Sequence, residues 1–292
     1  MAQASRRIRC REIEAADIDA VVGVLKEGFP NHGPDYWAQA LERLTAHGGV
    51  PGRPKYGYLL EADGRIVGVL LVIFAAVASG AQTIVRANIA SWYVESSYRS
   101  SAAMLTSRAH AHPGTTFLQL TPSPHVVPIV EAQGYRRYAL GMFAAITLLC
   151  ARVPGARVRA VTADLRAGDD LTRADCELLL DHQSYDCISL TCTLAGRRHP
   201  FVFARRWRRT RIGWLPFARL IYCRSLDDFV RFAGPLGRYL AFRGIPMILL
   251  DANASLPGIP GRFLNESARF FKGPETPRLG DLAYTELSMF GL

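Results

Sequence analysis

The feature that most constrains the fold is a succession of strands and helices that occurs twice along the chain. In each half, an apolar hairpin is followed by a further strand, a helix and another strand. The first hairpin turns at Asp63-Gly64, where glycine tolerates the positive φ of a tight turn, and the second turns at Gly196-Arg197. Strands that alternate with helices predict a mixed α/β sheet, and the two successions predict a duplicated fold.

The first half is expected to run strand, helix, helix, three strands, helix, strand, helix, strand. The expected strands are residues 8–13, 56–62, 66–74, 89–94, 116–120 and 138–149, and the expected helices are residues 16–29, 36–44, 100–111 and 125–132. In the second half we expect helices at residues 171–182 and 226–243 and strands at residues 188–194, 201–207, 219–223 and 245–251. Residues 150–156 are the expected linker, which gives two domains, residues 1–150 and residues 151–292.

The composition allows two folded domains with sizeable cores. Hydrophobic residues make up 49% of the 292 residues and charged residues 21%, which excludes an intrinsically disordered chain. The most apolar run, residues 66–79, is shorter than the roughly 20 residues of a membrane-spanning helix, and its β-branched residues favour a buried strand. We recognise no secretory leader and no CxxC pair among the six cysteines. A cytoplasmic protein with reduced thiols and no membrane partner is therefore expected.

The formal net charge of +10 comes mostly from arginine. The densest basic run is residues 205–211, in which Trp207 lies among arginines. Three interpretations are open: a strand edge protected by charge, a site for an acidic small molecule or glycan, and a nucleic-acid site, which is the least favoured. Three further basic residues are expected in Gly/Pro-rich loops, where they would line a site or serve the structure: Arg262, Lys272 and Arg278.

Residues 88–104 form a strand that runs through a tight turn into a helix. The turn contains Tyr98 and Arg99, and four small residues follow: Ser100, Ser101, Ala102 and Ala103. Backbone N–H groups at a helix start lack intrahelical partners, and the helix dipole favours an anion there. The pattern therefore predicts a pyrophosphate site at this turn.

Residues 6–149 resemble the GNAT family of acyl-CoA-dependent N-acyltransferases. The resemblance rests on the two opening helices, the hairpin, the strand that ends at Val94, the Tyr98-Arg99 pair, and Gly134-Tyr135, where the family often has Gly-Phe. It implies a mixed sheet that separates between its fourth and fifth strands and binds acyl-CoA in that split. The second half resembles a degenerate second copy, which gives two tandem GNAT-like domains.

The resemblance also implies which residues meet the co-substrate, acetyl-CoA or another acyl-CoA. The backbone N–H groups of Trp92, Tyr93 and Val94 would face the thioester. The pyrophosphate would lie on the residues that fit the family motif Arg/Gln-x-x-Gly-x-Gly/Ala: Arg99, Ser100, Ser101, Ala102 and Ala103. Ala102 replaces the first glycine of this motif, and Met104 replaces its second small residue.

The positions at which the family often has its base and acid hold residues that cannot transfer a proton. The base position, early on the separating strand, is Asn88, and the acid position, four residues before Gly134, is Val130. His125 is the candidate catalytic residue because histidine titrates in the required range; a surface residue at a helix start is the alternative. Three further candidates are less favoured: Glu95, Tyr135 and the terminal carboxylate of Leu292.

These observations predict a transferase that moves an acetyl or other acyl group from acyl-CoA to an amine. The acceptor would be a small molecule, for which an acidic compound or a glycan is a candidate. The alternative is a non-catalytic CoA-binding sensor or assembly module. No metal site is expected, because His110 and His112 point apart on a helix and no carboxylate or cysteine completes a ligand set.

Overall fold

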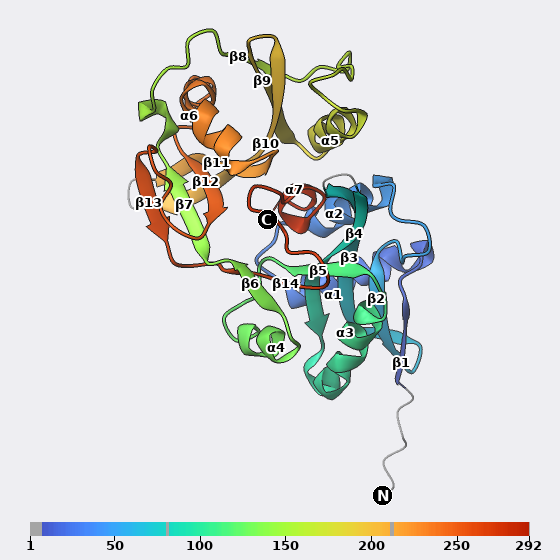
Figure 1. The fold of residues 1–292 in the computed structure, drawn as a ribbon. Coiled ribbons are helices and arrows are strands. Elements are labelled where there is room, and N and C mark those ends of the chain that lie inside the picture. Colours follow the sequence, from blue (N-terminus) through green and yellow to red (C-terminus); the bar gives the residue numbers. More distant parts are fainter. Residues whose placement is uncertain (1–7, 80–81, 211–212, 292) are drawn as a thin grey trace, which may run out of the picture. The chain divides into compact units, whose positions relative to one another are not determined.

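The chain forms two compact units in the computed structural model, which describes residues 8–79, 82–210 and 213–291 (Figure 1). Unit 1 comprises Met1–Tyr135 and Phe271–Thr276, and unit 2 comprises Arg136–Phe270 and Pro277–Leu292. A short segment near the C-terminus therefore belongs to unit 1. The boundary expected between residues 150 and 151 lies inside unit 2.

Unit 1 is built on five successive strands of one sheet. They are β1 (Ile8–Glu12), β2 (Gly57–Ala62), β3 (Arg65–Ser79), β4 (Gln82–Val94) and β5 (Thr115–Gln119). The helices are α1 (Ile18–Gly28), α2 (Tyr36–Ala46), α3 (Ala102–His110) and α4 (Val127–Ala132), with 3-10 helices η1 (Ala15–Asp17) and η2 (Ser96–Ser101). Strands β1 to β4 are antiparallel neighbours, and β5 is parallel to β4.

Helices α1 and α2 of unit 1 each bury one face. The buried positions on α1 are Val21, Val24 and Leu25, and those on α2 are Trp37, Ala40, Leu41 and Leu44. Residues three and four apart lie on one face of a helix, which explains both sets. α1 contacts β3 and β4, and α3 contacts β2 and β3. Residues 66–75 of β3 are all buried, which confirms that the apolar run is a covered strand.

Unit 2 repeats the succession of unit 1. Its elements are β8 (Arg157–Ala160), α5 (Arg173–Ser184), β9 (Cys187–Leu194), β10 (Arg197–Thr210), β11 (Gly213–Cys223), α6 (Leu226–Ala241) and β12 (Ile248–Ala252). β8 to β11 are antiparallel, and β12 is parallel to β11. Thr172 and Asp175 cap α5 reciprocally, and Ser225 caps α6. The predicted mixed α/β class is confirmed.

The outer strands of the two sheets do not follow chain order. The sheets run β1-β2-β3-β4-β5-β14-β6 and β8-β9-β10-β11-β12-β7-β13. The four strands not yet bounded are β6 (Arg136–Ala139), β7 (Gly141–Ala145), β13 (Gly261–Leu264) and β14 (Arg269–Lys272), and a last helix is α7 (Glu286–Met289). In unit 2, β7 lies between β12 and β13 and is antiparallel to both.

The single strand expected over residues 138–149 is therefore two strands, β6 and β7. Leu140 separates them, and its N–H donates to the side-chain oxygen of Asn253 (2.8 Å). The amide nitrogen of Asn253 donates to the carbonyl of Tyr138 (3.3 Å). The Asn253 side chain thus replaces the strand-to-strand hydrogen bonds that are missing at Leu140. Because Asn253 is distant in sequence, periodicity does not reveal the break between β6 and β7.

The prediction that Arg262 and Lys272 lie in loops is wrong, because Arg262 lies on β13 and Lys272 lies on β14. The segment 271–276 that follows packs on β5 of unit 1. Lys272 Nζ donates to the carbonyl of Gln133 (2.8 Å), and the N–H of Glu275 donates to Thr116 Oγ1 (3.3 Å). The contact is close enough that only glycine fits at residue 273.

Among residues 8–79, 82–210 and 213–291, no helix is long and apolar enough to cross a membrane. All six cysteines are thiols, and four of them are buried: Cys176, Cys187, Cys192 and Cys223.

We expect Gly273→Ala to destabilise unit 1 by about 1–3 kcal/mol. Gly273 has a φ of +147°, and an added Cβ would lie 2.6 Å from Thr116 Cα. Differential scanning calorimetry should show a lower Tm, by about 2–4 °C for each kcal/mol. Gly23→Ala is the control, because it adds a methyl group to an open position on α1 and should leave the Tm unchanged or raise it. Equal Tm values for the two variants would contradict the packing on β5.

Candidate functional site

The parallel strands of unit 1 separate part of the way along β4. β4 and β5 pair from Val85↔Thr115 to Asn88↔Leu118, and β4 then continues to Val94. Successive N–H groups of a strand point to alternate sides, so those of residues 89–94 that point away from β3 have no β5 partner. This is the separation between the fourth and fifth strands that the family resemblance implies.

A β-bulge changes the direction of β4 inside the split. The register with β3 shifts between Leu71↔Ala90 and Leu70↔Trp92, which leaves Ser91 as the extra residue. Ser91 has a φ of +44°, an uncommon value for a residue with a side chain. The bulge reverses the side-chain alternation, so Trp92 and Tyr93 exchange faces relative to an unbroken strand. No glycine marks the bulge in the sequence, so the local residue pattern does not predict it.

The turn after β4 is helical rather than open. The N–H of Glu95 donates to the carbonyl of Val67 (2.9 Å), and its carboxylate pairs with the Arg65 guanidinium (2.9 Å). η2 begins at Ser96, and the N–H of Tyr98 donates to the carbonyl of Glu95 (2.9 Å). The helical segment thus starts four residues earlier than the sequence predicts.

This early start changes which groups an anion would meet. The N–H groups of Ser96 and Ser97 precede the first i→i+3 bond, so they are the donors at the helix start. Arg99 is exposed one turn later, and the remaining predicted residues, Ser100, Ser101, Ala102 and Ala103, occupy later helical positions. Met104 is 40% exposed, so it does not fill the turn. The sequence pattern predicts a helix start at Ser100 and therefore does not point to Ser96 and Ser97.

Aromatic side chains gather at the end of β4. We call Phe29, His32, Tyr36, Trp37 and Tyr93 the aromatic cluster. The Phe29 ring lies 5.3 Å from that of Trp37 and 6.4 Å from that of Tyr93, between centroids. His32 stacks on Tyr36 at 4.1 Å. Burial lowers the pKa of His32, which favours the neutral ring. The density of aromatic residues between positions 29 and 37 is the sequence signal that could have identified this cluster.

Gly28 allows Tyr93 to lie against α1. A Cβ at Gly28 would lie 2.3 Å from Tyr93 Cγ, so the ring covers the glycine. Burial raises the pKa of Tyr93, and the carboxylates of Glu27 and Glu95 add to this effect. The end of β4 therefore presents a phenol that keeps its proton at neutral pH.

The positions predicted for proton transfer lie in different environments. Asn88 is 1% exposed, and its amide donates to the carbonyl of Ile89 (3.2 Å). Val130 is also 1% exposed, on α4. His125 precedes α4, is exposed, and has Nε2 3.2 Å from Ser123 Oγ. Of the less favoured candidates, Glu95 pairs with Arg65, Tyr135 contacts His110, and Leu292 lies outside the described residues.

His110 and His112 face separate partners. His110 Nε2 lies 2.8 Å from the hydroxyl of Tyr135. Burial lowers the pKa of His110 to about 4, and the charge of Lys272 adds to this effect. The ring of His112 lies between Arg53 and the hydroxyl of Tyr58. Within the part of the chain that the structure describes, no group of three or more His, Cys, Asp or Glu residues could hold a metal ion.

In unit 2, the corresponding split is filled by the chain itself. β11 and β12 pair only as far as Arg219↔Leu249. Beyond that point, residues 280–282 lie along β11 and take up its backbone groups. The contacts are Cys223 N–H to Gly280 O (2.9 Å), Leu282 N–H to Ile221 O (2.7 Å) and the bridge Tyr222↔Asp281.

Buried charges and the following helix also distinguish the split of unit 2. Asp251 accepts hydrogen bonds from Arg219 (2.5 Å) and Arg269 (3.1 Å), and all three residues are at most 7% exposed. α6 begins with Asp227 and Asp228, whose charges oppose an anion at its N-terminus. The filled strand edge and the acidic helix start of unit 2 thus both disfavour an extended anionic ligand.

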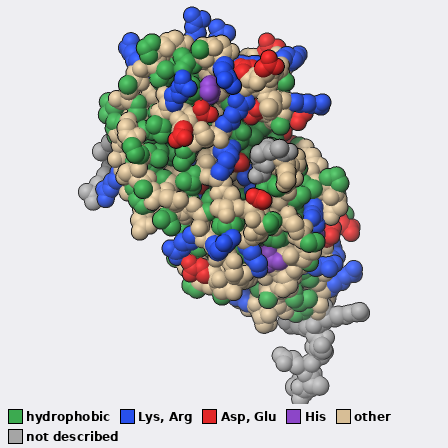
Figure 2. All heavy atoms as spheres, in the orientation of Figure 1, with side chains coloured by type: hydrophobic (Ala, Val, Ile, Leu, Met, Phe, Trp, Pro, Cys, Tyr) green, Lys and Arg blue, Asp and Glu red, His purple; other side chains and the backbone are tan. Residues whose placement is uncertain are grey.

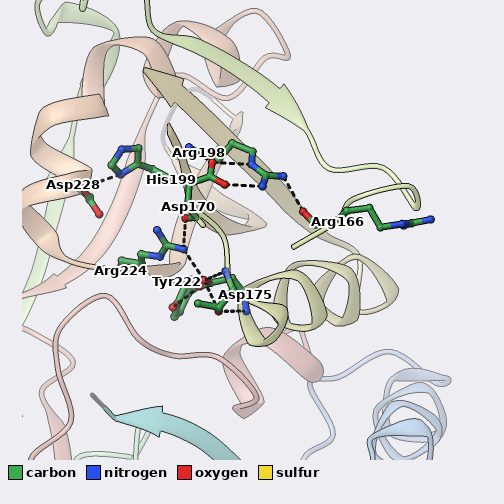
Figure 3. Close-up of polar contacts among 9 residues, drawn as sticks. Arg166, Asp170, Asp175, Arg198, His199, Tyr222, Arg224 and Asp228 are labelled. Carbon is green, nitrogen blue, oxygen red and sulfur yellow. Dashed lines mark hydrogen bonds and ion pairs between the residues drawn. The ribbon is translucent and has the colours of Figure 1, made fainter. Parts of the chain in front are cut away.

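Figure 3 shows a polar network in unit 2, near the start of α5. Arg198 forms two bonds with Asp170 (2.7 and 2.9 Å), and Arg224 donates to Asp175 (2.6 Å). Arg198 holds the pKa of Asp170 well below its usual range. Burial opposes ionisation of Asp175, but hydrogen bonds from Arg224 and Thr172 leave its pKa below the usual value. Carboxylates that remain ionised in this way are poor general acids, so the network serves the structure.

Comparison with known proteins identifies the fold. The chain is similar to a GCN5-related N-acetyltransferase from Anabaena variabilis ATCC 29413 (TM-score 0.63, 12% identity, 91% of this chain and 72% of that chain). It is also similar to a GCN5-related N-acetyltransferase from Kribbella flavida (TM-score 0.52, 13% identity, 91% and 71%). A third similar structure is Eis1 from Mycobacterium abscessus (TM-score 0.52, 11% identity, 94% and 74%).

No protein-family model and no curated protein sequence matches the chain. The similarity is therefore one of fold, at sequence identities of 11–13%. The chain has the fold of the GCN5-related N-acetyltransferases, as the resemblance in the sequence implies.

Asp251→Asn should lower the free energy of unfolding by about 3–5 kcal/mol, because it removes the carboxylate that two buried arginines share. Urea denaturation at neutral pH measures this loss. Glu177→Gln is the control, since it breaks a pair with Arg173 whose side chains are 89% and 58% exposed. The control should leave stability unchanged. An equally small effect at Asp251 would show that the buried charges do not depend on it.

The pH dependence of stability should report His110. Its pKa is about 4 in the folded protein and about 6.5 in the unfolded chain, so the unfolded state binds more protons between these values. Neutral His110 therefore contributes stability above pH 6.5 that is lost as the pH falls towards 4. His110→Gln should flatten the decrease of Tm over this range. A slope identical to that of the wild type would refute the assignment.

Proposed function

We propose that unit 1 binds an acyl-CoA thioester in the split beyond Asn88 and transfers its acyl group to an amine. The observation that carries the proposal is the contrast between two equivalent splits. Residues 280–282 take up the backbone groups of β11 in unit 2, whereas β5 leaves β4 at Asn88 in unit 1. The acetyltransferase fold of the chain supports the same assignment.

The groups at the end of β4 suit the two ends of such a ligand. The pyrophosphate would meet the N–H groups of Ser96 and Ser97 and the exposed guanidinium of Arg99. The next helical positions are those predicted from the motif: Ser100, Ser101, Ala102 and Ala103. The thioester oxygen would accept a hydrogen bond from a backbone N–H of the bulged stretch that includes Trp92, Tyr93 and Val94.

Acyl transfer then requires few groups from the protein. The amine nitrogen attacks the thioester carbonyl carbon, the C–S bond breaks, and the thiolate takes up a proton. Holding both reactants in the split supplies much of the rate. Asn88 and Val130 cannot accept or donate the proton, so we assign its removal to His125, directly or through water.

The aromatic cluster suits a small-molecule acceptor. Trp37 is buried beneath the cluster, and the half-buried rings of the other four residues offer faces to an ammonium group or to the C–H groups of a sugar. Glu27 is exposed beside Tyr93 and adds a negative charge that attracts a cationic amine. An amine on a small molecule or glycan therefore fits this end of the split.

The six thiols are consistent with the reducing cytoplasm, where we place the protein.

The alternative function is a non-catalytic CoA-binding module. The buried amide of Asn88 and the buried Val130 favour it, because both lie where the family often has its base and acid. The two functions share the binding site and differ in turnover.

Isothermal titration calorimetry with acetyl-CoA tests the binding site. The wild-type protein should bind, and Arg99→Glu should weaken binding by at least tenfold, or about 1.4 kcal/mol, because it reverses the charge beside the pyrophosphate. Arg152→Glu, at an exposed position in unit 2, makes the same charge change and should bind normally. Lack of binding of CoA, acetyl-CoA and longer acyl-CoAs by the wild type would exclude both functions.

Release of free CoA thiol in the presence of a panel of amines tests turnover. His125→Ala should lower the rate by about 10²-fold if His125 accepts the proton. Binding without thiol release across the panel would favour the non-catalytic module. A rate that His125→Ala leaves unchanged would remove His125 from the mechanism and retain the transferase.

A further inference from the structure

The hairpin of β10 and β11 extends beyond the sheet of unit 2. β9 pairs with β10 only as far as Ala204, and β12 pairs with β11 from Ala218. Between these limits, residues 205–210 pair with residues 213–218. We call this two-stranded extension the basic ribbon. Figure 2 shows basic side chains spread over the visible face of the molecule, so net charge alone does not single out a site.

The register of the basic ribbon places two tryptophans on one face. Trp207 lies opposite Pro216, and Arg209 lies opposite Trp214, so Trp207 and Trp214 are diagonal neighbours. Their side chains are 53% and 65% exposed. The guanidinium of Arg205 lies 5.0 Å from the Trp207 ring centroid, and Arg209 is exposed on the same face.

The opposite face of the ribbon is bound to its own unit. Arg206 belongs to that face, and it donates to the carbonyl of Leu287 (2.5 Å). The two faces therefore differ: one contributes to unit 2, and the other presents Trp207, Trp214, Arg205 and Arg209 to solvent.

Protection of a strand edge explains only part of this arrangement. Arginines on a half-paired strand prevent pairing with another chain, which is the first of the three interpretations of this basic run. Exposed tryptophans have the opposite effect, because they add apolar surface to the same face. Residues 205–217 contain no Asp or Glu, so the surface is complementary to an anion.

We propose that the exposed face of the basic ribbon binds single-stranded nucleic acid. The rings of Trp207 and Trp214 stack on bases, and Arg205 and Arg209 pair with the flanking phosphates. Single strands are favoured over a duplex because stacking on a flat face requires bases that are free of their partners. This activity goes beyond acyl transfer and does not depend on the split of unit 1.

Fluorescence anisotropy with the full chain and a labelled oligothymidylate of about 20 nucleotides tests the proposal. Trp207→Ala and Trp214→Ala should each weaken binding by at least fivefold. Phe242→Ala is the matched control, because Phe242 is an aromatic residue of unit 2 that is 88% exposed, and it should bind as the wild type does. An unchanged Tm should accompany each substitution. Lack of oligothymidylate binding by the wild type, or equal affinities for all variants, would overturn the proposal.

The contribution of the arginines is measured from salt dependence. The slope of log affinity against log salt should fall by about 0.7 for each lost phosphate contact, so Arg205→Gln and Arg209→Gln should each reduce it. Arg152→Gln should leave the slope unchanged. Wild-type slopes in both ribbon variants would remove these arginines from the site.

Two other probes show which class of ligand binds the basic ribbon. Heparin is a polyanion without bases, so Trp207→Ala should not weaken its binding if the rings stack on bases. Equal losses for heparin and oligothymidylate would overturn base stacking. Vesicles of phosphatidylcholine with phosphatidylglycerol test a membrane occupant. Binding to these vesicles, without binding to oligothymidylate, would replace nucleic acid by an anionic bilayer.

Discussion

The parallel pairing of β4 with β5 ends at Asn88↔Leu118, and the features of unit 1 that bear on function follow from this limit. A strand edge that loses its partner leaves N–H and C=O groups that cost about 1–3 kcal/mol each if they are buried and unsatisfied. Such a split therefore needs an occupant, whether water, ligand or chain. Unit 2 meets the same requirement with residues 280–282 of its own chain.

The last paired residues of the two splits differ in charge. Asn88 ends the pairing on β4, and Arg219 ends it on β11. Arg219 needs the buried carboxylate of Asp251, so the base of the split in unit 2 holds an ion pair. An uncharged amide at the same place in unit 1 requires no such counter-charge. The two units thus differ at an equivalent position. Unit 2 has arginine there and its split is filled by the chain, whereas unit 1 has asparagine there and we propose that its split binds a ligand.

Each unit includes a chain segment from the other half of the sequence. β7 follows the first succession in sequence but pairs with β12 and β13 of unit 2. Segment 271–276 comes late in sequence but packs on β5 of unit 1. Residues 1–150 alone would lack this segment and would carry β7 without its partners. The proposed site of unit 1 therefore depends on residues from both ends of the chain.

The sequence by itself determined the order of most strands and helices, the two hairpin–strand–helix–strand successions, and the turns of the two hairpins. These features follow from local periodicity, turn residues and side-chain chemistry within a few residues. Only the tertiary structure decided the bulge at Ser91, the early helix start at Ser96, the break between β6 and β7, and the filling of the split in unit 2. Each depends on a partner distant in sequence or on backbone geometry that no local residue pattern marks.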